Sequence, residues 1–372
     1  MRLLDRLRRR EAATDVAVVG SGLPALAVAL ELARRRRRVT LLGPAGRGEA
    51  PAGLGLAALG PSRPYDRVVR ALGAAPARGI WAAGRENLDR MRAFVAEAGI
   101  DCGLEARGSF LLAADRGEAE SLAESEDMLR DDGFSGEFLD HFMLETRFDL
   151  SGFAGAYWAA EGAGLDAAAL ARALAEKARS AGVAFVAAPV RSLETDGAGV
   201  EVHTSEGDVR AGAGVVATDA VATGLVGAVG RSLVSAASDR LRVALEPGAA
   251  LPSAARSVDG AVAWTASPPT LVLAATAPAV AEDGARLERL AARLPVRPGG
   301  GERWIEASEV ASDGLPVVGI LPGQPLAVAC GFGATAASWA FASAWWIAEA
   351  LASGRDATPP PLRPRPAPPG PV

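Results

Sequence analysis

Three small residues near the amino terminus have the types and spacing of a phosphate-binding turn. Gly20, Gly22 and Ala25 form a Gly-x-Gly-x-x-Ala pattern directly after the apolar run at residues 15–19. The first glycine permits a tight turn, the second lets the backbone approach a pyrophosphate, and the small alanine lets a helix pack closely on its strand. The N-terminus of that helix attracts phosphate groups. The pattern therefore predicts a dinucleotide cofactor, and a glycine turn without a ligand is the weaker interpretation.

Two later segments rich in glycine and alanine extend this pattern. Residues 215–220 read VVATDA, and residues 313–338 contain DGLPVVG followed by LAVACGFGATAAS. No catalytic base stands out, because His141 and His203 have the setting of ordinary surface or structural histidines. The chemistry-bearing residues are therefore expected at glycine turns, and the identity of a catalytic side chain stays unknown.

The elements that must position these turns follow from hydrophobic periodicity. Apolar runs at 15–19 and 38–42, with an Ala/Leu-rich helix over 23–36 between them, predict a β–α–β unit. Three- and four-residue spacing predicts a further helix over 80–100. Other strands are expected at 108–114, 240–245, 261–265 and 270–275. The Pro-rich end, residues 357–372, predicts a disordered tail.

The composition is that of a globular protein with no obvious macromolecular partner. The chain has 372 residues and a formal net charge of -5, so nucleic acid is not expected as a partner. Cys102 and Cys330 have no neighbouring metal ligands, so no metal site is predicted. No uninterrupted apolar run has the length of an integral membrane segment, and we expect a cytoplasmic protein. Peripheral membrane contact through the short basic N-terminus is the alternative to a solvated helix there.

The order of these motifs resembles the D-amino-acid-oxidase-like family of FAD-dependent oxidoreductases, which includes glycine, sarcosine and γ-glutamylputrescine oxidases. The resemblance runs from about residue 15 to 354 and includes GAGLDAAALARALAEKARSAGVAF and the block from ENLDRMRAF to GSFLLA. The chain has the features of a divergent member. An α/β fold is implied, with an FAD-binding, Rossmann-like (GR2-type) domain interleaved with an α+β substrate domain on a mixed, largely antiparallel sheet. The implied FAD-binding domain is discontinuous and the substrate domain fills the gaps, with ranges 14–80, 151–235 and 305–356 for the first and 81–150 and 236–304 for the second.

The resemblance also implies which residues bind cofactor and substrate. The family's FAD contacts carry over to Gly20, Ser21, Gly22, Leu23, Pro24, Ala25, Gly43, Pro44, Arg47, Val190, Ala217, Thr218, Gly331, Phe332, Gly333, Ala334 and Thr335. In the family the last of these turns abuts the flavin ring, and the helix after it stabilises negative charge on the reduced ring. The implied substrate pocket contains Trp304, Glu306 and Ser308.

Four departures from the family pattern affect the expected activity. Gly43 replaces the acid that accepts hydrogen bonds from the adenosine ribose, a loss of about 1–3 kcal/mol of cofactor affinity. Ser308 stands where amino-acid oxidases often carry an arginine that grips the substrate carboxylate, which leaves Glu306 and Glu309 as candidates to receive an ammonium group. The loop at 44–62 lacks the family's Ser/Asn-rich character. No cysteine occurs near Glu306, so FAD is expected to be non-covalent.

The implied reaction is oxidation of a C–N bond in a small amine or N-substituted amino acid, by hydride transfer to flavin N5. The departures motivate an alternative from a different class, a degenerate flavoprotein-fold subunit that acts as a non-catalytic scaffold or partner in a heteromeric oxidoreductase. An NAD(P)-dependent dehydrogenase is disfavoured by the late flavin-like segment. Both a homo-oligomer and a hetero-oligomer remain open.

Overall fold

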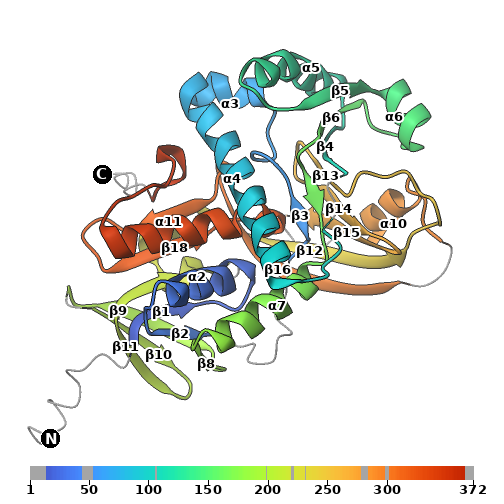
Figure 1. The fold of residues 1–372 in the computed structure, drawn as a ribbon. Helices are drawn as coiled ribbons and strands as arrows, with labels where there is room; N and C mark the ends of the chain where they lie inside the picture. Colours follow the sequence, from blue (N-terminus) through green and yellow to red (C-terminus); the bar gives the residue numbers. More distant parts are fainter. Residues whose placement is uncertain are drawn as a thin grey trace, which may run out of the picture.

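The described part of the chain folds around two eight-stranded sheets with helices packed against them (Figure 1). The computed structural model describes residues 14–43, 53–104, 107–197, 199–218, 222–230, 232–277, 284–297 and 301–364. A separate two-stranded pair consists of β3 (Leu56–Ala57) and β7 (Ala163–Gly164). No helix in the described ranges combines the length and the apolar character needed to cross a membrane.

The first sheet is a parallel core with an antiparallel edge and hairpin. Its strand order is β17-β18-β11-β1-β2-β8, and β10 and β9 extend it from β11. Its strands are β1 (Thr14–Val19), β2 (Val39–Leu42), β8 (Ala184–Val186), β9 (Val190–Thr195), β10 (Val200–Thr204), β11 (Gly207–Val216), β17 (Val317–Ile320) and β18 (Leu326–Cys330). β1 pairs in parallel with both β2 and β11, and β11 pairs in parallel with β18. The adjoining parts of β1, β11 and β18, residues 16–19, 214–216 and 326–330, are apolar and buried because both faces of the parallel core are covered.

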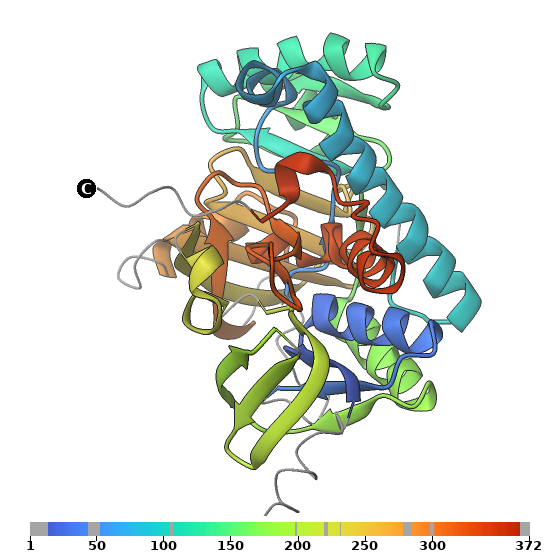
Figure 2. The same ribbon diagram turned by 90° about the vertical axis from the view of Figure 1, so that its left-hand side faces the viewer.

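A group of helices buries one face of this sheet. It comprises α2 (Leu23–Arg34), α4 (Ala74–Ala98), α7 (Ala167–Ser180) and α11 (Ala340–Ser353). α2 packs between α7 and α11, and α11 also contacts α4. Figure 2 shows α4 running past α11 towards α2. Val16 and Val18 of β1 lie in the largest buried cluster together with Leu26 of α2 and Trp346 of α11, so this face of β1 shares one core with both helices.

The second sheet is mixed and largely antiparallel, in the order β16-β12-β15-β14-β13-β4-β6-β5. Its strands are β4 (Ser109–Ala113), β5 (Gly136–Asp140), β6 (Gly155–Ala159), β12 (Leu233–Ala244), β13 (Ala254–Ser257), β14 (Val262–Ser267), β15 (Thr270–Ala277) and β16 (Glu302–Ala311). The pair of β13 with β4 is parallel. The remaining helices are α3 (Tyr65–Leu72), α5 (Arg116–Asp131), α6 (His141–Phe148), α8 (Ala222–Leu225), α9 (Gly227–Gly230), α10 (Gly284–Ala291) and the 3₁₀ turns η1 (Gly333–Ser338) and η2 (Pro360–Leu362).

Strand pairing differs from the predicted domain boundaries at two places. β6 pairs with β4 and β5, and β16 pairs with β12, so both strands belong to the second sheet. The predicted range 151–235 had assigned β6 to the FAD-binding part, and the predicted boundary between residues 304 and 305 divides β16. The chain crosses between the sheets inside the predicted ranges, which motif order does not reveal. The division into two domains itself stays a prediction.

The prediction of a disordered tail from residue 357 is wrong for its first eight residues. Leu362 is completely buried and belongs to the largest apolar cluster. The Arg363 guanidinium donates a hydrogen bond to the Thr358 carbonyl at 2.8 Å. A proline-rich segment can still pack against the core through a single leucine. The turn η2, which contains Leu362, packs beside α4 and β17. Residues 365–372 lie outside the described part of the chain.

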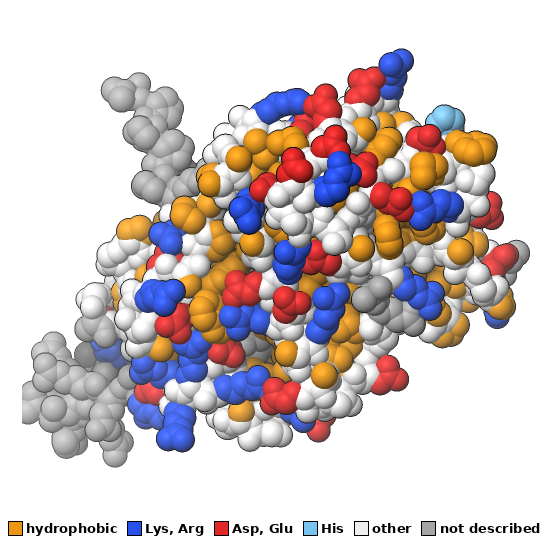
Figure 3. Space-filling view, turned by 45° about the horizontal axis from the view of Figure 1, so that its top comes forward, with side chains coloured by type: hydrophobic (Ala, Val, Ile, Leu, Met, Phe, Trp, Pro, Cys, Tyr) orange, Lys and Arg blue, Asp and Glu red, His pale blue; other side chains and the backbone are white. Residues whose placement is uncertain are grey.

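Charged side chains of both signs intermingle on the surface over α4 and α5 (Figure 3). Several are i,i+4 pairs along one helix, such as Arg90 with Glu86 and Arg116 with Glu120. Each exposed pair of this kind contributes a few tenths of a kcal/mol at most. The helices therefore owe their stability to their buried faces.

Candidate functional site

The three glycine- and alanine-rich motifs meet at one edge of the first sheet. Gly20 follows β1, Ala217 follows β11 and Gly331 follows β18. The parallel registers Val19↔Val216 and Val216↔Val328 align the carboxyl ends of these strands. The crevice outside such strand ends is where open α/β sheets bind ligands. Segments about 300 residues apart in the sequence thus form a single candidate site.

The turn after β1 requires glycine at its first position. Gly20 has φ +140°, and a β-carbon there would lie 2.1 Å from the carbonyl oxygen of Ala217. The Gly20 N–H donates to the Leu42 carbonyl at 2.8 Å, and the Ala217 N–H donates to the Val19 carbonyl at 2.8 Å. The turn is therefore held from both neighbouring strands, in a conformation closed to other residue types.

The helix after this turn begins with an open N-terminus. Gly22 is the N-cap of α2 and has no side-chain cap hydrogen bond, and a proline occupies the first turn. Leu23 and Ala25 are buried, so the first turn of the helix is fixed against the sheet. The half-buried Ser21 completes the loop. Uncapped N–H groups and the positive end of the helix dipole at this position suit an anionic group.

Gly43, the expected acid position, is packed against the same turn. It follows β2 directly, and its N–H donates to the Val186 carbonyl at 3.2 Å. A β-carbon at Gly43 would lie 2.9 Å from the Gly20 carbonyl oxygen and 3.2 Å from the Ser21 β-carbon. The absence of a side chain at residue 43 thus coincides with a close approach of β2 to the turn.

Two other predicted cofactor-binding residues, Val190 and Thr218, are half-buried. Val190 begins β9 and is half-buried against the apolar cluster that contains Val19 and Leu42. Thr218 follows Ala217 at the strand edge and is half-buried. Pro44 and Arg47 lie outside the described residues, as does Glu49.

The glycine turn after β18 is sharply bent and internally bonded. Gly331 and Gly333 have φ values of +77° and +52°. The Thr335 hydroxyl donates to the Phe332 carbonyl at 2.7 Å, and Phe332 forms a β-bridge with Val310 of β16. The turn therefore connects the edge of the first sheet to a strand of the second sheet.

The N-terminus of the helix after this turn is capped by a side chain from another helix. The turn continues into η1, and α11 begins at Ala340, beyond a break at Trp339. The buried Asn87 of α4 caps α11, because its Oδ1 accepts the N–H groups of Phe341 at 2.9 Å and Ala342 at 3.2 Å. The first N–H groups of α11 thus already have an acceptor, and the action of the helix dipole on a flavin ring stays a prediction.

A cavity of about 390 Å³ lies between the glycine turn and the second sheet. Its lining residues are Leu56, Pro61, Ser62, Arg63, Arg256, Val258, Asp259, Gly260, Val262, Ala263, Thr276, Ser308, Val310, Ala311, Ser312, Gly314, Pro316, Gly331, Phe332, Ala334, Thr335 and Trp339. The predicted flavin-ring turn and the predicted pocket residue Ser308 therefore share one cavity. Ser338 fixes the wall next to it, because its hydroxyl donates to the Leu56 carbonyl and accepts the Ala58 N–H, each at 3.0 Å.

Trp304 and Glu306 are not among the residues that line this cavity. The Arg242 guanidinium lies 5.2 Å from the centre of the Trp304 ring. A carboxylate oxygen of Glu306 lies 3.5 Å from Nη2 of the buried Arg240, so Glu306 already has a cationic partner. Burial lowers the pKa of Arg240, and the Glu306 charge opposes that shift.

Glu309, the other acid expected to receive an ammonium group, has a different partner. Its carboxylate accepts the backbone N–H of Ala222 at 2.9 Å, and its side chain is buried. Because side chains alternate along a strand, Glu309 points to the opposite face of β16 from Ser308. Neither predicted acid is therefore presented to the cavity.

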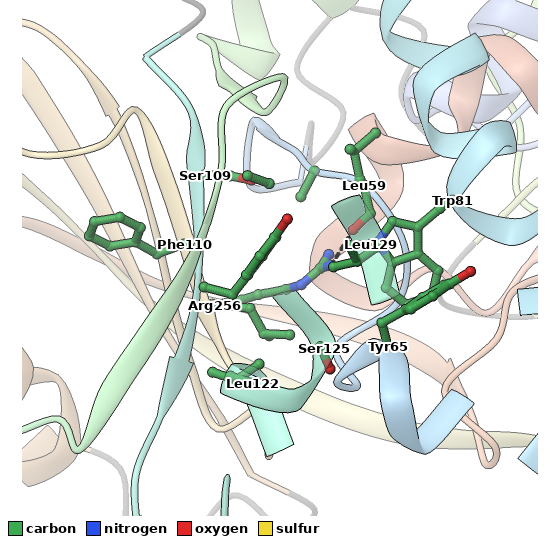
Figure 4. Close-up of a pocket in the computed structure, with 13 residues that line it drawn as sticks. Leu59, Tyr65, Trp81, Ser109, Phe110, Leu122, Ser125, Leu129 and Arg256 are labelled. Atoms are coloured by element: carbon green, nitrogen blue, oxygen red, sulfur yellow. Dashed lines mark hydrogen bonds between the residues drawn. The ribbon is translucent and has the colours of Figure 1, made fainter. Parts of the chain in front are cut away.

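Sequence reasoning missed a buried arginine beside the cavity. Arg256 lies in β13, a strand that the alternation pattern did not predict, and 4% of its surface is exposed. It also borders a small neighbouring cavity together with Tyr65 and Tyr157 (Figure 4). Burial raises the pKa of both tyrosines, so they stay neutral. The available signal was one arginine in a run of small residues, Ser253–Ser257, which is weak without a structure.

The family comparison agrees with this arrangement of motifs. A model of the family described as FAD dependent oxidoreductase (DAO) matches residues 15–353. The chain belongs to this family of FAD-dependent oxidoreductases. The resemblance drawn from the motifs is confirmed, and so is the fold class, because the match runs through both sheets.

Individual relatives are similar at low identity. Glycine oxidase of Geobacillus kaustophilus (strain HTA426) is 31% identical over 226 residues, a match that covers 59% of this chain and 58% of the relative. The sequence match thus spans less than two thirds of that relative's length. The crystal structure of glycine oxidase from Geobacillus kaustophilus superposes with a TM-score of 0.78 at 24% identity, covering 95% of this chain and 99% of that one. L-proline dehydrogenase from P. horikoshii has a TM-score of 0.73 at 16% identity, covering 92% and 94%.

Proposed function

We propose that this DAO-family oxidoreductase oxidises a C–N bond of a small amine or N-substituted amino acid and binds its FAD non-covalently. The observation that carries the proposal is the cavity of about 390 Å³ between the glycine turn at Gly331 and the sheet face at Ser308. It adjoins the strand edge at which the Gly20 turn lies. A dinucleotide along that edge would therefore end with its reactive ring beside a space of substrate size.

The described residues fit FAD both at the turn after β1 and at the glycine turn after β18. The uncapped N-terminus of α2 suits the pyrophosphate. The glycine turn of residues 331–335 leaves one wall of the cavity without large side chains apart from Phe332. Gly43 offers no acid for the ribose, so we propose that affinity rests mainly on the backbone of the turn.

Non-covalent attachment is supported by the positions of the two cysteines. Cys102 and Cys330 are both buried, and neither lines the large cavity. Burial raises the pKa of the Cys102 thiol, which keeps it in its unreactive protonated form.

FAD, when bound, supplies a two-electron acceptor for the hydride of the substrate carbon. The chain's own part is to position the substrate and exclude water. Cavity-wall residues such as Val258, Val262 and Val310 provide an apolar surface that favours a neutral amine over its ammonium form. This reaction does not need a dedicated base once the amine is neutral. The relatives named glycine oxidase and L-proline dehydrogenase support a small nitrogen-bearing substrate.

The test is anaerobic reduction of the bound flavin by a panel of amines and amino acids. We expect at least one member to bleach the flavin absorbance within the mixing time or over minutes, and a Gly20→Val protein to serve as the flavin-free control. The scaffold alternative predicts that no member reduces the flavin while dithionite still does. That result would contradict the proposed oxidation.

A further inference from the structure

β16 is a long edge strand at the rim of the second sheet (Figure 1). Its ten residues pair with β12 in an unbroken antiparallel register. No described strand pairs with its outer side over residues 302–309, and the bridge from Val310 to Phe332 covers the carboxyl end alone. Natural proteins usually shorten, bulge or cover such an edge, or place a proline in it, because an open edge invites another strand. β16 contains no proline and no bulge against β12.

The backbone groups of the odd-numbered residues of β16 face this outer side. The Ala311 N–H donates to the Gly331 carbonyl at 3.4 Å, which is on the side away from β12. In a strand, the backbone groups of every second residue point to the same edge. The N–H and C=O groups of Ile305 and Ala307 therefore also point away from β12, in the direction from which a further strand would pair.

The charges that usually guard an edge strand are already paired across to β12. The three pairs are Glu302 with Arg242, Arg303 with Asp239, and Glu306 with Arg240. The three acids balance the three arginines, so this part of the rim has no net charge that would repel a second copy. Between the charged residues lies Ile305, whose side chain is 64% exposed. The middle of the edge is thus apolar and electrically neutral.

One antiparallel register makes β16 complementary to itself. A two-fold axis at Ile305 places Glu302 opposite Ser308, Arg303 opposite Ala307, and Trp304 opposite Glu306. No like charges are then directly opposed, which favours the pairing. An axis at residue 304 would oppose Glu302 with Glu306, and an axis at 303 or 306 would oppose a charge with its own copy. An axis at 307 or beyond would place the second strand over residues 310 and 311, where the turn at Gly331–Phe332 already lies.

We propose that β16 is a dimerisation strand, through which two copies of this chain pair antiparallel over residues 302–308. The two second sheets then form one continuous sheet, and the two Ile305 residues exchange backbone hydrogen bonds at the two-fold axis. Such an interface uses the same surface on both copies and closes on itself, so it produces a dimer and not a filament. The inference concerns assembly and stands apart from the proposed function.

The first test is the mass of the purified full-length protein, measured by light scattering after gel filtration. We expect two chains for the natural protein and for Phe142→Lys, the matched control, because Phe142 is also 64% exposed but lies on α6. Ile305→Lys should be a single chain, since it opposes two lysines at the axis. Ala307→Pro should weaken the dimer about tenfold or more, because it removes an N–H that points away from β12 from each copy. Circular dichroism checks that each variant is folded.

The second test reads the register directly and does not depend on the lysine variant. The two α-carbons of residue 305 should lie about 5.5 Å apart in this pairing. A short bismaleimide should therefore join two Ile305→Cys chains in dilute solution and leave Phe142→Cys chains unjoined. Cys102 and Cys330 are buried and should not react in the folded protein.

Three results would each overturn the proposal. They are a natural protein that is a single chain at micromolar concentration, a folded Ile305→Lys protein that keeps the mass of two chains, and failure of the residue-305 cross-link to form. A natural dimer that is cross-linked at residue 305 and dissociated by Ile305→Lys would establish it.

Discussion

The carbonyl oxygen of Gly20 lies 2.9 Å from the position that a β-carbon on Gly43 would occupy. The end of β2 and the glycine turn after β1 thus approach each other closely through their backbones. A side chain at residue 43 would require the turn to move, because the nearest atom belongs to the backbone and cannot rotate away.

Gly43→Glu should therefore weaken FAD binding rather than restore the acid typical of the family. We expect lower flavin occupancy after purification and a loss of about 1–3 kcal/mol in the free energy of unfolding, from the collision with the turn. Flavin absorbance per protein and urea denaturation measure the two effects. Gly79→Ala is the control, since no atom beyond the neighbouring backbone of its own helix lies within 4 Å of the added β-carbon, and the helix α4 should gain about 0.5–1 kcal/mol. Tighter FAD binding by the Gly43→Glu protein would contradict this account.

Asn87→Ala should be among the more destabilising single changes in the helix layer. It removes the acceptor for Phe341 and Ala342 and the donor to the Ala337 carbonyl at 2.8 Å, all at a completely buried position. Leaving these groups unpaired should cost about 2–4 kcal/mol in the free energy of unfolding. The exposed cap Asp140, which accepts the Met143 N–H at 2.8 Å, provides the comparison. Changing Asp140 to alanine should lower the free energy of unfolding by about 1 kcal/mol. Equal losses for Asn87→Ala and Asp140→Ala would contradict the larger contribution expected of the buried cap.

Ser338→Ala should loosen the loop that walls the cavity. Its hydroxyl joins η1 to the loop by donating to the Leu56 carbonyl and accepting the Ala58 N–H. We expect a loss of about 1–3 kcal/mol in stability, since a buried carbonyl and a buried N–H each lose a partner. Faster amide exchange at Ala58, measured by hydrogen exchange and mass spectrometry, should accompany it. Unchanged exchange there would mean that the loop is held by other contacts.

His203 should give the hairpin of β9 and β10 a small pH-dependent stability. The hydrogen bond from Nδ1 to the Asp208 carboxylate, at 2.9 Å, raises the pKa of His203 above its ordinary value. The folded pKa exceeds the unfolded one, so the stabilisation is fully present below about pH 6.5 and is lost as pH rises through the folded pKa. At this exposed site it should not exceed about 0.5 kcal/mol. An NMR titration should show the raised pKa in the natural protein and a lower one in Asp208→Asn, where Glu194 and Glu201 are the acids that still raise it.

Local patterns predicted the parts of the site that depend on backbone shape. Gly20, Gly22 and Ala25 identified the first turn because their small size is required within six consecutive residues, and the strand after them follows from apolar runs. Gly331 and Gly333 marked the second turn for the same reason. These predictions need no knowledge of distant contacts.

Long-range pairing explains most of what the sequence did not reveal. Nothing near Glu306 in the sequence indicates that Arg240 is its partner, and nothing near Asn87 indicates that it caps a helix about 250 residues later. Arg256 was missed because its meaning comes from burial and from carbonyls at 59–61, not from its neighbours in the chain.

The absorbance spectrum of the purified protein, recorded before and after denaturation, tests the central claim most directly. The account predicts flavin bands in the native protein and, after heat or acid precipitation of the chain, FAD free in the supernatant. FAD release confirms a non-covalent cofactor at an edge that lacks the ribose acid. A protein without flavin bands after purification and incubation with excess FAD, or with flavin that remains in the precipitate, would contradict it.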